Sequence, residues 1–139
     1  MTRVVLGVEY DGSAYSGWQR QHHADTVQAR LEQALAAVAC HPVTTVAAGR
    51  TDAGVHACER VAHFDTHATR PDRAWVRGVN THLPGGIGVR WAVQSVSGFD
   101  ARRSAVSRRY RYLLVDRPTQ PALLRHRVGW AWRSLPGAA

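Results

Sequence analysis

The hydrophobic and polar positions of this 139-residue chain follow strand and helix periods in turn. An apolar, β-branched run over Arg3–Tyr10 predicts a first strand, and the polar residues 11–24 after it predict a long loop. A helix is expected next, because apolar residues recur there at helical spacing and Asp25 or Thr26 can cap its first turn. The apolar positions of its buried face are Val27, Leu31, Leu35 and Val38. His41-Pro42 then ends the helix.

The rest of the pattern predicts a second helix and four more strands. Pro71 opens this helix and Pro84-Gly85-Gly86 ends it, with Trp75, Val79 and Leu83 on its apolar face. The further strands are expected at Val43–Ala48, Arg60–Asp65, Ile87–Val96 and Ser107–Val115. The order is therefore βαββαβ with an added strand. It predicts an α+β, ferredoxin-like antiparallel sheet with both helices on one face.

The distribution of charge points to a partner. All 18 cationic side chains are arginine. Residues 1–98 hold nine arginines against eight acids, a net charge of +1, whereas residues 99–139 hold nine against two, a net charge of +7. A segment this basic favours a polyanion, because phosphate contacts release counterions and the arginine fork fits phosphates. A merely solvated surface is the alternative explanation.

Other features of the sequence exclude several classes of protein. No apolar run approaches the roughly 18 residues of a membrane helix, and the first residues do not have the pattern of a signal peptide. Cys40 and Cys58 lack C-x-x-C spacing, so reduced, buried thiols in a cytosolic protein are expected. The eight histidines are scattered, and we expect no metal site.

The most informative segment is the string at residues 49–57, Gly-Arg-Thr-Asp-Ala-Gly-Val-His-Ala, between two predicted strands. It places Asp52 between Arg50 and Gly54. A carboxylate so placed can act as a nucleophile or a base, and Arg50 can neutralise a phosphate or keep Asp52 ionised. The alternative is an ordinary glycine-rich turn in which Asp52 bonds its own backbone.

This string resembles the signature loop of the TruA-type tRNA pseudouridine synthases. Further resemblances to the family lie at residues 10–21, 26–35, 63–66, 75–84, 99–102 and 108–112. They include Tyr-Asp-Gly-Ser-Ala-Tyr-Ser-Gly-Trp-Gln-Arg-Gln at 10–21 and Arg-Arg-Tyr-Arg-Tyr at 108–112. The resemblance covers nearly the whole chain, but only about the first half of the family's usual length.

The resemblance implies a reaction and a set of site residues. Uridine in tRNA would be isomerised to pseudouridine, with Asp52 as the catalytic carboxylate and no cofactor. Arg50 would fill the space left by the flipped base, and Tyr110 would stack on the uracil. The RNA contacts that we expect are Arg20, Thr51, Gly54, His56, Arg102, Arg108, Arg109 and Arg111.

The resemblance also implies partners and a domain organisation. It implies uridines 38–40 of the anticodon stem-loop as targets, and a homodimer that clamps the tRNA in the cytoplasm. Residues 1–117 would be the N-terminal catalytic domain, and residues 118–139 would start the connection to a second half. The chain departs from the family at Asp100, where histidine is common, and at Arg60, where glutamine is frequent. An acid at position 100 is expected to weaken the basic groove locally.

Two other functions remain open from the residues alone. A ferredoxin-like sheet can bind single-stranded RNA without catalysing any reaction, although no standard RNP motif is present. A truncated, inactive half could instead assemble with a full-length enzyme. Measured turnover would separate the enzyme from both alternatives.

Overall fold

The computed structural model describes residues 1–95, 98–105, 107, 109–116, 119–123 and 127–131. The chain divides into two compact units, Met1–Val106 and Ser107–Ala139. The first unit contains β1 (Thr2–Tyr10), η1 (Gly12–Ala14), α1 (Val27–Ala39), β2 (Thr45–Ala47), β3 (Ala57–Thr66), η2 (Ala74–Gly78), α2 (Val79–His82) and β4 (Ile87–Gln94). The second contains β5 (Leu114–Asp116) and β6 (Gly129–Ala131). The functional division into residues 1–117 and 118–139 stays a prediction.

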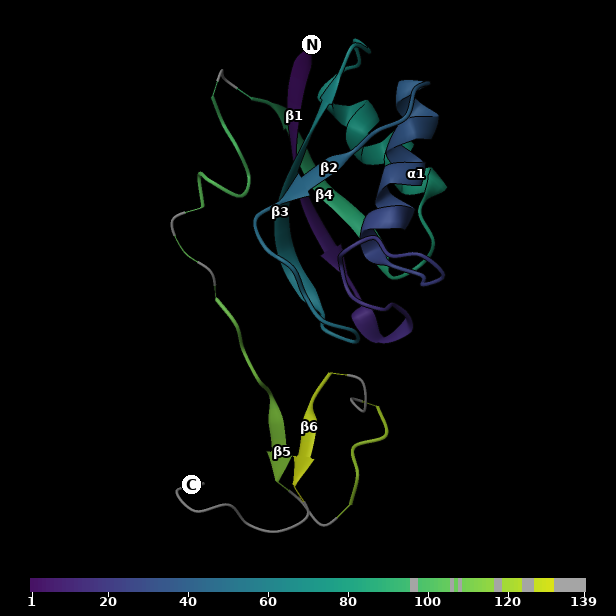
Figure 1. The fold of residues 1–139 in the computed structure, drawn as a ribbon. Coiled ribbons are helices and arrows are strands. Elements are labelled where there is room, and N and C mark those ends of the chain that lie inside the picture. The colour runs from purple at the N-terminus through teal and green to yellow at the C-terminus, as the bar shows by residue number, and fades with distance from the viewer. Residues whose placement is uncertain (96–97, 106, 108, 117–118, 124–126, 132–139) are drawn as a thin grey trace. The chain divides into compact units, whose positions relative to one another are not determined.

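The first unit is built on a four-stranded antiparallel sheet with the strand order β2-β3-β1-β4. The helices lie on one face of this sheet (Figure 1). Strand β1 is central, and its Leu6 lies opposite Ala62 of β3 and Ala92 of β4. This arrangement confirms the α+β, ferredoxin-like fold expected from the order of the elements.

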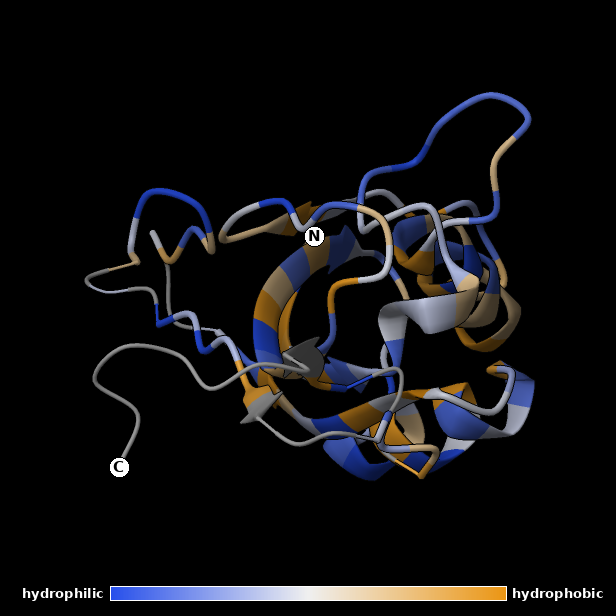
Figure 2. Ribbon diagram, turned by 90° about the horizontal axis from the view of Figure 1, so that it is seen from below, coloured by the Kyte–Doolittle hydropathy of each residue, from blue (hydrophilic) through white to orange (hydrophobic). Residues whose placement is uncertain are grey.

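The hydrophobic core lies between the sheet and the helices. Alternate residues of β1, among them Leu6 and Val8, are fully buried against the helices, and hydrophilic and hydrophobic residues alternate along the strands (Figure 2). The ring of Trp75 packs edge-on against Phe64 with 5.0 Å between the ring centroids. Trp18, from the loop after β1, is also buried in this core. That loop is therefore anchored to the core.

Helix α1 buries Val27, Leu31 and Leu35 as predicted, whereas Val38 is only partly buried, and one of the two predicted caps is present. The Thr26 hydroxyl accepts a hydrogen bond from the backbone N–H of Ala29 at 3.3 Å. Asp25 forms an ion pair with Arg30 at 2.8 Å instead. The helix ends at Ala39, and the C-cap residue Cys40 has a left-handed φ of 61°, just before the predicted His41-Pro42. Cys40 and Cys58 are both exposed, so the prediction that their thiols are buried is wrong.

The second helical stretch starts after Pro71 as expected, but its middle differs from a regular α-helix. Residues Ala74–Gly78 form the π-helical η2, and α2 follows directly and ends at His82. In the part of the chain that the structure describes, no helix is long and apolar enough to span a membrane.

The added strand takes a different form from the one predicted over Ser107–Val115. Among the described residues of this range and its continuation, Leu114–Asp116 alone forms a strand, β5, which pairs in parallel with β6 in a separate two-stranded sheet. Tyr110 and Tyr112 are 62% and 95% exposed. Because these β-forming side chains have no buried face to occupy, their local propensity does not produce a longer strand.

Candidate active site

The segment between β2 and β3 carries the signature string and is held from one side by the loop after β1. Thr51 is buried, and its hydroxyl lies 2.8 Å from the hydroxyl of Tyr10. The Thr51 carbonyl accepts a hydrogen bond from the backbone N–H of Trp18 at 3.1 Å. Thr51, which we expected to contact RNA, therefore fixes the backbone immediately before Asp52.

A second set of bonds fixes the backbone after Asp52. The N–H of Gly54 donates to the Tyr15 carbonyl at 3.3 Å. His56 Nδ1 accepts from the N–H of Gly12 at 3.0 Å and lies 3.3 Å from a carboxylate oxygen of Asp11. Gly54 and His56, also expected to contact RNA, thus bind the neighbouring loop. Because bonds flank Asp52 on both sides, its position is set by the two loops together.

Two glycines allow these loops to approach each other so closely. A Cβ on Gly12 would lie 2.6 Å from the carbonyl carbon of Val55 and closer still to its oxygen. A Cβ on Gly17 would lie 2.6 Å from the Thr51 carbonyl oxygen, and Gly17 has a φ of +88°. Any other residue at these positions would push the loops apart.

Asp52 lies exposed at the turn of this braced loop. Its carbonyl accepts from the N–H of Val55 at 3.2 Å, and Gly54 has a φ of +79°. Among the described residues, no hydrogen bond or ion pair engages the Asp52 carboxylate. The alternative explanation of the string required the Asp52 side chain to bond the backbone of its own turn, and it does not. It is therefore available to a ligand.

Arg50 is exposed on the same loop. No ion pair joins Arg50 to Asp52 in the described part of the chain. The expectation that Arg50 holds Asp52 ionised therefore finds no contact in this structure, and the Arg50 guanidinium also faces solvent.

Arg60, in strand β3, supports the loop that carries Asp52, a role that the sequence did not suggest. Its Nη1 donates to the Gly49 carbonyl at 2.5 Å, and its guanidinium carbon lies 5.7 Å from the centroid of the Trp18 ring. Among the described residues, its buried Nε has no hydrogen-bond partner. Arg60 thus links both loops.

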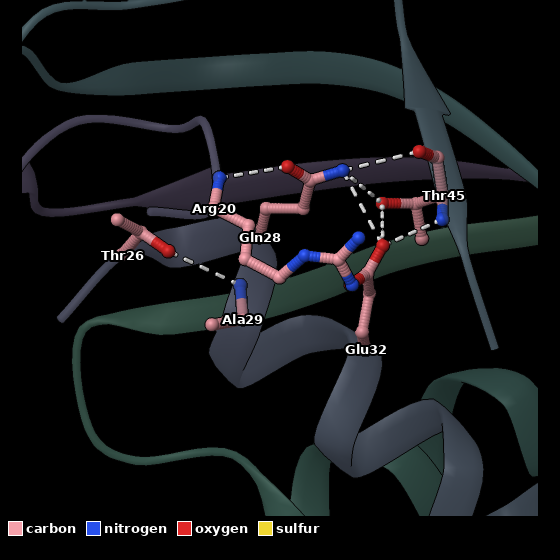
Figure 3. Close-up of polar contacts among 6 residues, drawn as sticks. All are labelled: Arg20, Thr26, Gln28, Ala29, Glu32 and Thr45. Carbon is pink, nitrogen blue, oxygen red and sulfur yellow. Dashed lines mark hydrogen bonds and ion pairs between the residues drawn. The ribbon is translucent and has the colours of Figure 1, made fainter. Parts of the chain in front are cut away.

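Arg20, another expected RNA contact, is tied to a polar network that sequence reasoning missed. Its Nη1 lies 2.6 Å from Glu32, and its side chain is 56% exposed. Glu32 also binds Gln28 and Thr45 (Figure 3). The only signal in the sequence was a glutamine and a glutamate spaced i, i+4 on a helix, a spacing too common to single out.

The remaining expected RNA contacts are arginines. Arg102 is exposed at the end of the first unit. In the second unit, Arg109, Tyr110 and Arg111 are exposed. Arg108 lies outside the described residues.

Asp100 has a structural role close to this basic segment. Its carboxylate accepts the backbone N–H groups of Arg102 and Arg103, both at 2.9 Å. The Arg103 bond is the largest of several effects that lower the pKa of Asp100 below its ordinary value. The acid therefore caps a turn that presents Arg102, whereas we had expected it only to weaken the basic groove.

The described residues include no cluster of three or more His, Cys, Asp or Glu side chains that could hold a metal ion. The arrangement offers an exposed carboxylate, a neighbouring guanidinium and a backbone that is hydrogen-bonded on both sides of Asp52. A carboxylate of this kind can add to an electrophilic carbon or remove a proton from a bound substrate.

Comparisons with known proteins agree with the resemblance of the motifs. Residues 7–102 match the family model described as tRNA pseudouridine synthase. The chain is similar to proteins named tRNA pseudouridine synthase A from three bacteria. It is 58% identical to the Aromatoleum aromaticum protein over 128 aligned residues, which make up 92% of this chain and 48% of that relative.

Two further relatives have the same name. The Coxiella burnetii (strain Dugway 5J108-111) protein is 54% identical over 135 residues, 97% of this chain and 52% of the relative. The Hydrogenovibrio crunogenus protein is 51% identical over 135 residues, with the same coverages of 97% and 52%. The chain thus spans about half the length of the curated relatives it matches.

Proposed function

The chain belongs to the tRNA pseudouridine synthase family, and from this membership we propose that the protein isomerises uridine to pseudouridine in tRNA. In this reaction the C1′–N1 glycosidic bond breaks, the detached uracil turns, and a C1′–C5 bond forms. The C5 proton leaves and N1 regains a proton, so that the product is an isomer of the substrate. No electrons are gained or lost.

The observation that carries this proposal is the state of Asp52. Its carboxylate is exposed and has no partner among the described residues, while the backbone around it is bonded on both sides. A preorganised carboxylate can act on a nucleotide without a prior rearrangement of the loop. We therefore assign Asp52 as the catalytic carboxylate, acting on the sugar, on the base or on the C5 proton.

Arg50 and Tyr110 complete the proposed set of catalytic groups. A uridine in a stem is reachable only after it flips out of the stack. Arg50, exposed two residues before Asp52, would occupy the space that the base leaves. Tyr110 would stack its exposed ring on the flipped uracil.

The finer assignments rest on the resemblance to the family. Uridines 38–40 of the anticodon stem-loop would be the targets, in a cytoplasmic homodimer that needs no cofactor. Arg20, Arg102, Arg108, Arg109 and Arg111 would contact phosphates. The net charge of +7 over residues 99–139 supports phosphate contacts in that segment.

A chimera tests the activity, because the chain spans about half of its relatives. In this chimera, the present chain replaces the matching half of the Aromatoleum aromaticum protein. The substrate is a tRNA transcript with tritium on C5 of its uridines, so that release of tritium reports loss of the C5 proton. The intact relative is the positive control, and its second half alone is the blank.

We expect the chimera to release tritium and to form pseudouridine in the anticodon stem-loop. A folded chimera that binds tRNA but releases no tritium would contradict the proposal. That result would favour an RNA-binding module without catalytic activity.

A further inference from the structure

Glu32 is a buried carboxylate that the proposed reaction does not use. It is 6% exposed, and donors from three segments surround it. It accepts from Arg20 Nη1 at 2.6 Å, from the Thr45 N–H at 2.7 Å and from the Thr45 hydroxyl at 3.1 Å. Gln28 Nε2 lies 3.3 Å away (Figure 3). A buried charge with this many partners is held rigidly, since losing any of them is costly.

Arg20 is held by two hydrogen bonds, which leave most of its guanidinium N–H donors unused. Its backbone N–H donates to Gln28 Oε1 at 2.9 Å, and one guanidinium nitrogen bonds Glu32. The side chain is still 56% exposed, and in the described part of the chain it makes no other hydrogen bond. Its remaining N–H donors are therefore available to a ligand that approaches from the solvent. Arg20 also lines a surface pocket with Gln21 and His22.

The position of Arg20 relates it to the candidate active site. Trp18, two residues earlier, donates its backbone N–H to the carbonyl of Thr51, the residue before Asp52. The Trp18 carbonyl in turn accepts from the N–H of Gln28 at 2.9 Å. At about 3.8 Å per residue, the Cα of Arg20 lies within about 8 Å of that of Trp18. Arg20 is thus linked through Trp18 to the residue before Asp52, so an RNA strand bound at Asp52 could bring one of its phosphates to Arg20.

We propose that Glu32 is a positioning residue that holds the Arg20 guanidinium to bind an RNA backbone phosphate beside the target nucleotide. This inference rests on the proposed function, which supplies RNA as the ligand. The inference predicts the direction in which RNA affinity changes when the Glu32 charge is removed. Bulk electrostatics alone predicts that removing a carboxylate strengthens the binding of a polyanion. Positioning predicts that removing this carboxylate weakens it.

The test measures the affinity of the chain for an unmodified tRNA transcript over a series of salt concentrations. The variants are Arg20→Ala, Glu32→Gln, Glu32→Asp and the double variant Arg20→Ala/Glu32→Gln. The matched control is Asp25→Asn, because Asp25 is an exposed carboxylate that pairs with Arg30 near the same loop. Thr45→Val removes one hydroxyl donor to Glu32 and shows how much the network contributes to stability alone.

We expect Arg20→Ala and Glu32→Gln each to weaken binding several-fold and to reduce the salt slope by about one unit. The double variant should lose no more than Arg20→Ala alone. Glu32→Asp keeps the charge but withdraws it by one methylene, so it should also weaken binding. Asp25→Asn should bind equally or more tightly, and Thr45→Val should lower the melting temperature without changing the slope.

Equal or tighter binding by folded Glu32→Gln would overturn the inference, as would additive losses in the double variant. If Glu32→Gln does not fold, Glu32→Asp decides in its place, and unchanged affinity there overturns the inference. A wild-type chain that binds no tRNA at all would overturn this inference, and tritium release by the chimera then decides the proposed function separately. Binding by the wild type that is insensitive to Glu32 overturns the inference alone.

Discussion

At the scale of single residues, His63 fixes the segment that leads into the basic stretch. It is 3% exposed, and its Nδ1 accepts from the backbone N–H of Ala101 at 3.0 Å. Phe99 packs edge-on against its ring, with 6.5 Å between the ring centroids. Arg3 holds the same segment through the Phe99 carbonyl at 2.5 Å. The exposed Arg102 therefore extends from an anchored turn.

This contact predicts a dependence of stability on pH. Burial lowers the pKa of His63 below its ordinary 6.5 and nearby Arg3 lowers it further, whereas Asp100 and Asp65 oppose the shift. The unfolded chain therefore takes up the proton first as the pH falls. The contribution of His63 to the free energy of unfolding is therefore largest at pH values above its ordinary pKa of 6.5. It declines as the pH falls below that value, until folded His63 is protonated as well.

Urea unfolding of the chain checks this prediction between about pH 7 and 5. We expect the urea midpoint to fall over this range in the wild type and to change less in His63→Phe. His82→Gln changes an exposed histidine of α2 and should follow the wild type. A His63→Phe variant with the full pH dependence would refute the assignment. The carboxyl groups with lowered pKa, Asp25, Asp65 and Asp100, contribute only in a more acidic range.

At the scale of elements, the candidate active site depends on two loops that are in backbone contact. Gly12 belongs to η1, and its N–H bonds His56, which belongs to the other loop. Its φ is not positive, so alanine is compatible with its backbone. A side chain there is opposed by the collision with Val55 and by the close Gly54 carbonyl carbon, 3.1 Å from a Cβ.

Gly12→Ala should therefore destabilise the loop pair by about 1–3 kcal/mol, the usual cost of overpacking. Gly54→Ala provides the comparison, because Gly54 has a φ of +79° but open space where a Cβ would stand. It should cost about 1–2 kcal/mol from backbone strain alone. Chemical denaturation measures both destabilisation energies. Tritium release by the Gly12→Ala chimera should fall by more than the loss of folded protein alone would cause. An unperturbed Gly12→Ala variant would show that the loops are not in close contact.

The elements also show how far local sequence determines this fold. Helix α1 and strand β1 were predicted nearly to their ends, because apolar spacing and the Thr26 cap are local signals. The π-helical η2 and the short β5 were not, because both depend on packing that is absent from local propensity. The string around Asp52 identified the loop. Its supports, such as Trp18 and Arg60, are long-range contacts that no spacing predicts.

At the scale of the whole molecule, the first unit has a closed core but open sheet edges. Strands β2 and β4 lie at the edges of the four-stranded sheet. Val93 of β4 and Val46 of β2 are 46% and 36% exposed. Edges and apolar side chains of this kind favour pairing with another chain.

We therefore expect residues 1–139 alone to self-associate, to bind tRNA weakly and to form little pseudouridine. Exposed Asp52 lacks an enclosing wall in the described part of the chain, and water around a carboxylate reduces electrostatic catalysis. Gel filtration and tritium release on the chain, compared with the chimera, check this expectation. A monodisperse monomer with the turnover of the chimera would show that this half is sufficient.

The most direct test of the central claim is the turnover of the chimera carrying Asp52→Asn. Asparagine keeps the size of the side chain and removes its charge. Asp72→Asn, an exposed aspartate at the start of the second helical stretch, is the matched control. If Asp52 is the catalytic carboxylate, tritium release should fall by several orders of magnitude in Asp52→Asn alone, while tRNA affinity stays within about threefold of the wild type. An Asp52→Asn chimera that releases tritium at nearly the wild-type rate would contradict the account.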